Sequence, residues 1–274
     1  MNSSNSKVAI ITGGASGIGR ALCEELALTD TIVVAADINI EGAKQVAAQI
    51  SGNGGSVRAE ELDVTDAQAV KVLIDRVTAE YGRLDYIFNN AGITVGAEVR
   101  DMDLGHFRSV LDTNLYGVIY GTLYAYEVMV KQGFGHIVNT ASLAGLLPFP
   151  IQVPYCATKF GVVGFSKSLR IEAAALGVRI SVVCPGFVRT GIFEASRFLK
   201  INKQKIMEKM PLKMVEPDQA AQRILKGVRK NKAVIVFPFG ARFFYWLYSF
   251  HPAFLVPIHR KMLADFRLLR ETSK

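Results

Sequence analysis

Short apolar runs alternate with segments of helical periodicity along most of the chain. The runs are continuous and rich in Val, Ile and Ala, as in VAIIT at 8–12, which is typical of parallel strands with helices on both faces. Between them, apolar residues recur every three or four positions, which predicts helices. The strands are expected at 8–12, 32–37, 57–63, 84–90, 136–142, 178–186 and 233–237, and the helices at 20–28, 41–50, 66–81, 105–131, 154–176 and 217–230.

Seven strands separated by helices predict an α/β fold, a doubly wound parallel sheet of the Rossmann type with right-handed crossovers. No internal repeat or low-complexity linker interrupts the pattern. We therefore expect one Rossmann-like domain over residues 1–238, with a substrate loop at 187–215. A helical extension that is aromatic and basic is expected over residues 239–274.

The composition excludes several classes of protein. With 50% hydrophobic residues in 274, the chain is neither disordered nor collagen-like. No charge-free apolar run approaches the roughly 20 residues of a membrane-spanning helix, and the N-terminal segment lacks the apolar stretch of an export signal. Cys23, Cys156 and Cys184 have neither CxxC nor Cys/His spacing. We expect reduced thiols in a cytoplasmic protein, without a disulfide or a metal.

The charge is unevenly distributed. Residues 1–196 carry 15 Lys and Arg against 19 Asp and Glu, whereas residues 197–274 carry 17 against 5, so the whole excess of the +8 chain lies in its last part. Such a basic segment suits nucleic acid, an anionic membrane surface or a solvated helical face.

A glycine-rich segment, TGGASGIG at 12–19, directly follows the first predicted strand and precedes a helix. Gly13 would permit the tight turn, Gly17 would let the backbone approach a pyrophosphate, and Gly19 would allow close packing of helix on strand. A free helix N-terminus attracts phosphate. A glycine cluster can also be a plain turn, but its place between strand and helix favours a dinucleotide site.

Asp37 ends the second predicted strand, about 20 residues after the glycine segment. A carboxylate at this place accepts hydrogen bonds from the adenosine ribose and repels a 2′-phosphate. The alternative is a solvated turn aspartate. No Lys or Arg lies in the glycine segment before Arg20, or after Asp37 before Lys44, so NAD is favoured over NADP.

Ser142, Tyr155 and Lys159 form a candidate catalytic set. Tyr155 and Lys159 are four residues apart in a predicted helix and are therefore neighbours on one face. An ammonium beside a phenol favours the phenolate and lowers its pKa from about 10. Ser142 could bind the same substrate oxygen, and Asn114 could hold a water that links Lys159 to solvent. Each residue alone could be structural, but behind a dinucleotide site the set indicates catalysis.

These motifs resemble the short-subunit branch of the short-chain dehydrogenase/reductase family over about residues 6–190. TGxxxGxG, an Asp-Val pair, NNAG, the helix Asn, the Ser, YxxxK and PGxxxT all occur here in order. The resemblance implies a Rossmann-like domain that binds a nicotinamide cofactor. The cofactor-binding residues that it and the arguments above designate are Gly13, Ser16, Gly17, Ile18, Gly19, Asp37, Asp63, Val64, Asn90, Ala91, Gly92, Tyr155, Lys159, Pro185, Gly186, Val188 and Thr190.

The same resemblance implies hydride transfer between an alcohol and a ketone. Tyr155 would be the general acid/base, Lys159 would bind the nicotinamide ribose and lower the pKa of Tyr155, Ser142 would orient the substrate oxygen, and Asn114 would support a proton relay. Segments 142–168 and 183–193 look most like hydroxyprostaglandin and hydroxysteroid dehydrogenases. A homodimer or homotetramer is expected. The alternative function is a non-catalytic nucleotide sensor or scaffold with the same fold.

The expected substrate segments are apolar, which suits a lipophilic secondary alcohol or ketone. No charge lies between Ser142 and Tyr155. The alternative is that these residues pack against a neighbouring subunit. The apolar candidates are Leu143, Leu146, Leu147, Pro148, Phe149, Ile151, Val153, Phe187, Ile192, Phe193 and Phe198.

The C-terminal extension combines aromatic and basic residues. Eight Phe, Tyr and Trp lie within 239–258, and Arg260, Lys261, Arg267 and Arg270 follow. Pro252 and Pro257 interrupt the run, so a spanning helix is not expected. The mixture suits peripheral contact with an anionic membrane. A segment that covers the substrate pocket or a subunit interface is the equal alternative, and no recognition motif supports nucleic acid.

Overall fold

The computed structural model describes residues 6–192, 196–200 and 214–270. Its centre is a seven-stranded sheet in the order β3-β2-β1-β4-β6-β7-β9, in which every neighbouring pair is parallel. The predicted doubly wound sheet is therefore confirmed. The strands are β1 (Lys7–Thr12), β2 (Thr31–Asp37), β3 (Val57–Glu61), β4 (Tyr86–Asn89), β6 (Gly135–Thr140), β7 (Val178–Pro185) and β9 (Val234–Phe237).

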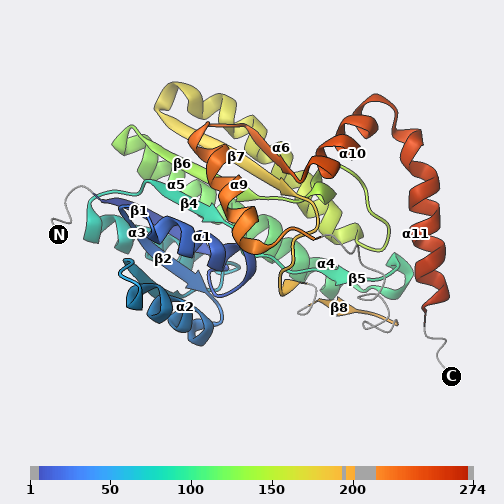
Figure 1. Ribbon diagram of the computed structural model, residues 1–274, viewed down its shortest axis with the longest axis horizontal. Coiled ribbons are helices and arrows are strands. Elements are labelled where there is room, and N and C mark those ends of the chain that lie inside the picture. The colour runs from blue at the N-terminus through green and yellow to red at the C-terminus, as the bar shows by residue number, and fades with distance from the viewer. Residues whose placement is uncertain (1–5, 193–195, 201–213, 271–274) are drawn as a thin grey trace.

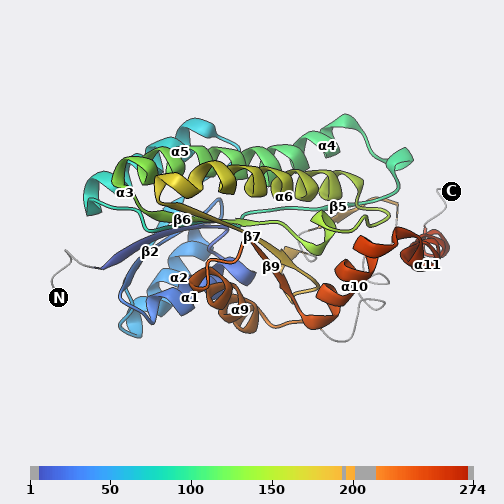
Figure 2. The same ribbon diagram turned by 90° about the horizontal axis from the view of Figure 1, so that it is seen from above.

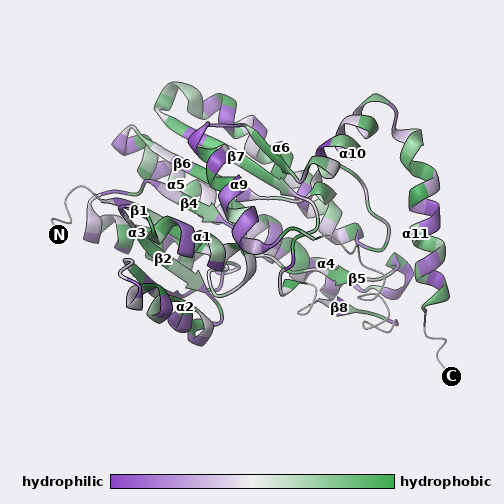
Figure 3. Ribbon diagram, viewed as in Figure 1, coloured by the Kyte–Doolittle hydropathy of each residue, from purple (hydrophilic) through white to green (hydrophobic). Residues whose placement is uncertain are grey.

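Helices cover both faces of this sheet, which explains why its inner strands are apolar on both sides (Figures 1 and 2). In Figure 3 these strands are coloured as hydrophobic over most of their length. The helices of the main body are α1 (Gly17–Ala27), α2 (Ile40–Gly52), α3 (Ala67–Tyr81), α4 (Leu104–Leu111), α5 (Gly117–Gln132), α6 (Val153–Ala173) and α9 (Pro217–Arg229).

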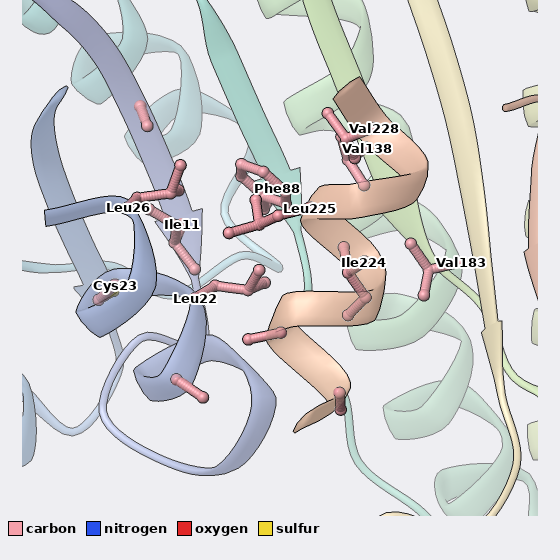
Figure 4. Packing of buried hydrophobic residues seen from close by; sticks show 14 of the residues in the cluster. Ile11, Leu22, Cys23, Leu26, Phe88, Val138, Val183, Ile224, Leu225 and Val228 are labelled. Carbon is pink, nitrogen blue, oxygen red and sulfur yellow. The ribbon is translucent and has the colours of Figure 1, made fainter. Parts of the chain in front are cut away.

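The core lies in two layers, one on each face of the sheet. On one face α1, α2 and α9 pack against the strands, with Leu22, Ile224 and Phe88 fully buried between them (Figure 4). On the other face α3, α5 and α6 bury a second cluster around Ile87 and Met129. This double cover fixes the strand ends that carry the candidate site.

Two features differ from the expected pattern. The helix expected at 105–131 is broken between α4 and α5 by a π-helical turn, η2 (Asp112–Tyr116), which contains Asn114. Such turns are frequent at functional sites. A two-stranded parallel ribbon, β5 (Val95–Gly96) with β8 (Arg197–Phe198), was not expected. Strands of two residues carry no detectable periodicity.

The C-terminal segment forms α10 (Phe239–Phe250), a short turn η5 (Pro252–Leu255) and α11 (Val256–Leu268). Pro252 and Pro257 lie in the first turns of η5 and α11, where proline needs no hydrogen-bonding N–H. Ala241 and Leu255 are buried with Leu143 of the main body. No helix of the described residues is long and apolar enough to cross a membrane.

Candidate functional site

A cavity of about 870 Å³ lies at the carboxyl ends of the central strands, where open α/β sheets bind their ligands. Its walls include the ends of β2, β6 and β7 and the loops after β1 and β4. Of the predicted cofactor-binding residues, all but Gly19 line it. Of the predicted catalytic residues, Ser142, Tyr155 and Lys159 line it and Asn114 does not.

The glycine segment forms the cradle that a pyrophosphate requires. Gly13 and Gly17 have φ values of +68° and +52°, which disfavour any residue with a Cβ. A Cβ at Gly19 would lie 2.0 Å from the Gly13 carbonyl oxygen. Gly19 therefore lets α1 pack closely against the glycine segment, although it does not itself line the cavity. Ser16 precedes α1 and its side chain caps no helical N–H. The first N–H groups of α1 are therefore free for an anion, and the residues present fit a dinucleotide.

Thr12 joins this cradle to the NNAG segment. Its hydroxyl oxygen accepts hydrogen bonds from the backbone N–H of Asn90 at 2.9 Å and of Ala91 at 3.1 Å. The Asn90 amide donates in return to the Thr12 carbonyl at 3.1 Å. Sequence reasoning did not give Thr12 a role, although it is the first residue of the glycine motif.

Asp37 lies at the end of β2 with its carboxylate held by the backbone. One oxygen accepts from the N–H of Ala15 at 3.0 Å and the other from the N–H of Asn39 at 2.9 Å. Among the described residues that line the cavity, no Arg occurs and Lys159 is the one Lys. This part of the cavity wall is therefore acidic, and its expected contact with an adenosine ribose stays a prediction.

Tyr155 and Lys159 lie on α6 and face Ser142 across the cavity wall. The Lys159 Nζ is 5.5 Å from the centroid of the Tyr155 ring and donates to the Thr140 carbonyl at 2.8 Å. Ser142 Oγ accepts from the N–H of Ala144 at 3.1 Å. The YxxxK spacing and the Ser thus bring three polar groups to one point, as expected.

Burial sets the protonation of this group. It raises the pKa of Tyr155 to about 12, although a hydrogen bond with Ser142 acts in the opposite direction. It lowers the pKa of Lys159 to about 8. The net pKa of Tyr155 is raised because desolvation of the phenol outweighs the opposing hydrogen bond, and the expected effect of Lys159 on it stays a prediction. Tyr155 is consequently a phenol at neutral pH.

Asn114 holds the chain beside the site. Its Oδ1 accepts from the Ile93 N–H and its Nδ2 donates to the Ile93 carbonyl, both at 2.8 Å. Gly92 packs against it, since a Cβ there would lie 3.2 Å from Asn114 Oδ1 and 3.7 Å from Lys159 Nζ. The side-chain amide therefore fixes the chain at Ile93, and the water that Asn114 was expected to hold between Lys159 and solvent stays a prediction.

The far end of the cavity is apolar. Among the predicted substrate residues, Leu146 is buried in the core and Val153 is 43% exposed; these two and Pro148 do not line the cavity. Phe193 and most of the 187–215 loop lie outside the described residues. The predicted apolar residues that do line it are Leu143, Leu147, Phe149, Ile151, Phe187, Ile192 and Phe198.

The C-terminal segment forms one wall of the cavity. The sequence had left open whether this segment covers the pocket, covers a subunit interface or contacts a membrane. Besides Phe244 and Leu255, one face of α11 lines the cavity. The signal that could have found this face is its three- and four-residue spacing. Its members are Ile258, His259, Met262, Asp265 and Phe266, and Leu269 lines the cavity just after the helix ends.

Ion pairs fasten α11 to the loop after β5. Arg267 donates to Glu98, with Nη2 to Oε2 at 2.9 Å, and Arg270 Nη2 lies 2.6 Å from Asp101 Oδ1. Arg267 and Arg100 together hold the pKa of Glu98 at about 2. We call Glu98, Asp101, Arg267 and Arg270 the ion-pair latch. Arg267 and Arg270, two of the basic residues for which the sequence suggested contact with an anionic membrane, therefore form ion pairs within the protein.

The three cysteines are free and buried. Burial raises the pKa of each thiol, for Cys184 to about 12, so none is a thiolate at neutral pH. No group of three His, Cys, Asp or Glu able to hold a metal occurs among the described residues.

Comparison with known proteins agrees with this geometry. A family model described as short chain dehydrogenase matches residues 7–198. D-Threitol dehydrogenase from Mycolicibacterium smegmatis is 41% identical over 67% of this chain and 71% of its own. The 3-oxoacyl-acyl-carrier-protein reductase FabG from Thermotoga maritima is 36% identical over 80% of this chain and 89% of its own.

A solved structure is similar along the whole chain. A short-chain dehydrogenase/reductase from Burkholderia phymatum, in complex with NAD, has a TM-score of 0.80 and 26% identity, and covers 100% of this chain and 99% of its own. These relatives do not show the finer likeness to hydroxysteroid or hydroxyprostaglandin dehydrogenases. The chain belongs to the short-chain dehydrogenase family, oxidoreductases that use a nicotinamide cofactor on CH–OH groups.

Proposed function

We propose that the protein is an NAD-dependent oxidoreductase that interconverts a lipophilic secondary alcohol and its ketone, with Tyr155 as general acid/base. One observation carries the proposal. A single cavity joins the Asp37 end and the glycine cradle to apolar walls, and Tyr155 and Ser142 lie on its lining. Positioned reactants and a positioned proton donor are what this reaction needs.

The chain's own groups account for the proton transfer. The nicotinamide, when bound, exchanges the hydride with the substrate carbon. In reduction, Tyr155 donates its proton to the carbonyl oxygen, which suits a phenol with a raised pKa. In oxidation, Tyr155 must first lose that proton. The buried Lys159 ammonium then stabilises the phenolate across a short distance of low polarity.

The preference for NAD rests on Asp37. Its carboxylate is fixed by Ala15 and Asn39, so it cannot easily turn away from a ribose. A 2′-phosphate would meet this charge with no Arg among the described lining residues to compensate for it. The Burkholderia phymatum relative was solved with NAD, which supports the same choice.

The substrate class rests on the cavity rather than on the relatives' names. D-Threitol is a polyol and the FabG substrate is a 3-oxoacyl group, so these names point to different chemistry. The substrate end of this cavity has apolar walls, with His259, Asp265 and Gln152 as its few polar side chains. We therefore favour a lipophilic substrate, and propose steroids, prostanoids, retinoids and long-chain alcohols as its first candidates.

We also propose a cytoplasmic homodimer or homotetramer. Large apolar side chains are exposed on neighbouring α5 and α6, among them Leu123, Phe160 and Ile171. Such residues suit a subunit interface. Light scattering of the purified protein would measure its mass, and a monomer at all concentrations would contradict the proposal.

The experiment measures NADH formation from NAD with this panel of alcohols, for the protein and for Tyr155→Phe. We expect turnover of at least one lipophilic alcohol and a loss of about 10²–10⁴-fold in the variant. NADH binding should persist, because only the transferable proton is removed. Tyr116→Phe is the matched control, since Tyr116 is the last residue of η2 and does not line the cavity.

Two results would contradict the proposal. If Tyr155→Phe keeps more than about a tenth of the rate, Tyr155 is not the general acid/base. If NADH binds but no alcohol or ketone is turned over, the non-catalytic sensor or scaffold becomes the better interpretation.

A further inference from the structure

One face of α10 is aromatic and exposed. Phe239, Phe243, Trp246 and Phe250 recur every three or four residues and are 79%, 49%, 56% and 72% exposed. Three of the rings are in contact: the centroids of Phe243 and Trp246 are 6.2 Å apart and those of Trp246 and Phe250 are 4.9 Å apart. We call these four residues the aromatic face. A contiguous apolar surface of this kind marks an interaction site.

The rest of α10 is already occupied. Ala241 is buried, and Tyr245 and Tyr248 pack against the cluster that holds Leu143 and Leu255. The helix therefore has one side fixed to the body and the other turned outward. Figures 1 and 2 agree that α10 and α11 lie at one end of the molecule, beyond the main helices.

Three cations of the C-terminal segment are unpaired among the described residues, one on α10 itself and two on α11. The sequence from 239 to 270 has five basic residues and one acidic residue, Asp265. Arg267 and Arg270 belong to the ion-pair latch. Arg242, Arg260 and Lys261 are exposed, and within the described part of the chain they form no ion pair. Aromatic side chains beside Lys and Arg suit the headgroup layer of an anionic bilayer.

The aromatic face continues into the rim of the substrate cavity. Phe244, Ile258 and Met262 line the cavity and are also 41%, 45% and 36% exposed. The Phe244 ring lies 6.1 Å from that of Phe243, centroid to centroid. A surface that covered the aromatic face would therefore also lie close to the cavity entrance.

We infer that the aromatic face docks on an anionic lipid surface, with Arg242, Arg260 and Lys261 against the headgroups. The rim of the cavity then faces the bilayer, from which a lipophilic substrate can enter. A second copy is a poorer occupant: a two-fold contact would place the cations of one chain near those of the other, without nearby acids to pair them. Substrate entry rests on the proposed function, whereas docking does not.

Trp246 gives a direct readout, because it is the single Trp of the chain. Its fluorescence is recorded as vesicles of phosphatidylglycerol and phosphatidylcholine are added, and again with phosphatidylcholine alone. We expect a blue shift and quenching by brominated lipid with the anionic vesicles, and sedimentation with them. Both should weaken with neutral vesicles and with added salt. No substrate is present, so failure here is distinct from failure of the dehydrogenase assay.

Two pairs of substitutions separate the contributions. Phe243→Gln with Phe250→Gln should abolish sedimentation while leaving Trp246 as reporter. Arg260→Gln with Lys261→Gln should weaken the partition coefficient about fivefold for each charge removed. The matched control is Leu28→Gln with Val72→Gln, two apolar residues at the end of α1 and on α3 that are 81% and 51% exposed, which should bind as the unchanged protein does.

The inference is overturned by either of two outcomes. In the first, Trp246 emission is unchanged with anionic vesicles at low salt and the protein stays in the supernatant. In the second, the blue shift depends on protein concentration without any lipid and the particle mass doubles, which identifies the aromatic face as an interface between copies.

Discussion

The two ends of the cavity are built by different means. At the cofactor end, the contacts are made to the backbone: Gly19 packs on the Gly13 carbonyl, and the Thr12 hydroxyl accepts from the backbone N–H groups of Asn90 and Ala91. At the substrate end, α11 is held by side chains, through the ion-pair latch and a half-exposed apolar face.

This difference predicts how each end tolerates change. Backbone contacts inside a packed sheet leave no room for an added atom. At the substrate end, the ion pairs join long side chains, and each carboxylate of the latch pairs with a second cation, Arg100 or Lys200, so the loss of one pair is partly compensated. We therefore expect substitutions at the cofactor end to weaken cofactor binding strongly. Substitutions at the substrate end should change the KM of the alcohol or ketone by small factors.

The largest effect is expected for Gly19→Ala. The added Cβ would lie 2.0 Å from the Gly13 oxygen and 2.7 Å from its carbon, so the cradle must move. We expect the Kd for NADH to rise about a hundredfold, from a strain of roughly 1–3 kcal/mol. Binding is measured by the fluorescence of NADH.

Gly164→Ala on α6 is the matched control, because nothing lies within 4 Å of its added Cβ. It should leave NADH binding unchanged and stabilise the helix by up to about 1 kcal/mol. Equal affinity in the Gly19 and Gly164 variants would refute the rigidity assigned to the cofactor end.

The pH dependence of oxidation should be steep. The pKa of Tyr155 is raised to about 12, so below that pH the phenolate fraction grows about tenfold per unit. kcat/KM for oxidation should rise several tens of times from about pH 6 to 8. The rise should slow above pH 8, because the pKa of Lys159 is about 8 and its charge is then lost. Reduction, which uses the phenol, should not rise. A flat oxidation profile would contradict this assignment.

Asp37→Asn should change cofactor choice by a smaller factor. The amide keeps the size of the side chain but loses the charge that binds ribose hydroxyls and repels a 2′-phosphate. We expect kcat/KM with NAD to fall about tenfold and the ratio of NAD to NADP to fall with it. Asp30→Asn is the control, because Asp30 contacts Ser6 far from the cavity. A wild-type preference for NADP would remove the basis of the prediction.

The cofactor end could be predicted from sequence because its determinants are local. The glycine segment, NNAG and YxxxK each lie at a strand end or on one helix, and parallel strands bring such ends to one edge. Tyr155 and Lys159 needed only their spacing. Thr12 was not predicted even here, since a threonine in a strand gives no sign that its hydroxyl will bind the residues that follow the neighbouring strand β4.

The substrate end could not be predicted to the same depth because it depends on distant contacts. Glu98 and Arg267 are 169 residues apart, and nothing local pairs them. The raised pKa of Tyr155 likewise comes from burial, which the Tyr-Lys spacing alone does not report. The prediction that apolar side chains line the cavity was correct for most of the residues named. Leu146 lies in the core and Val153 is exposed, because an irregular loop has no periodic pattern from which the direction of each side chain could be predicted.

The smallest effect is expected for the ion-pair latch. Arg267→Ala with Arg270→Ala removes the bonds from α11 to Glu98 and Asp101, while the apolar contacts of Phe266 and Leu255 remain. The side chains of Glu98 and Asp101 are only 9% and 4% exposed, but each keeps a second cation, Arg100 and Lys200 respectively. Neither carboxylate is left unpaired in the variant, so α11 should loosen without unfolding. KM for a lipophilic alcohol should rise about threefold, with kcat and the Kd for NADH unchanged. Arg260→Ala with Lys261→Ala is the control, because these residues of α11 lie outside the cavity and the latch. Without vesicles, this control should not alter KM.

If the latch variant instead lost NADH binding, the two ends of the cavity would not be independent, and the comparison between them would fail.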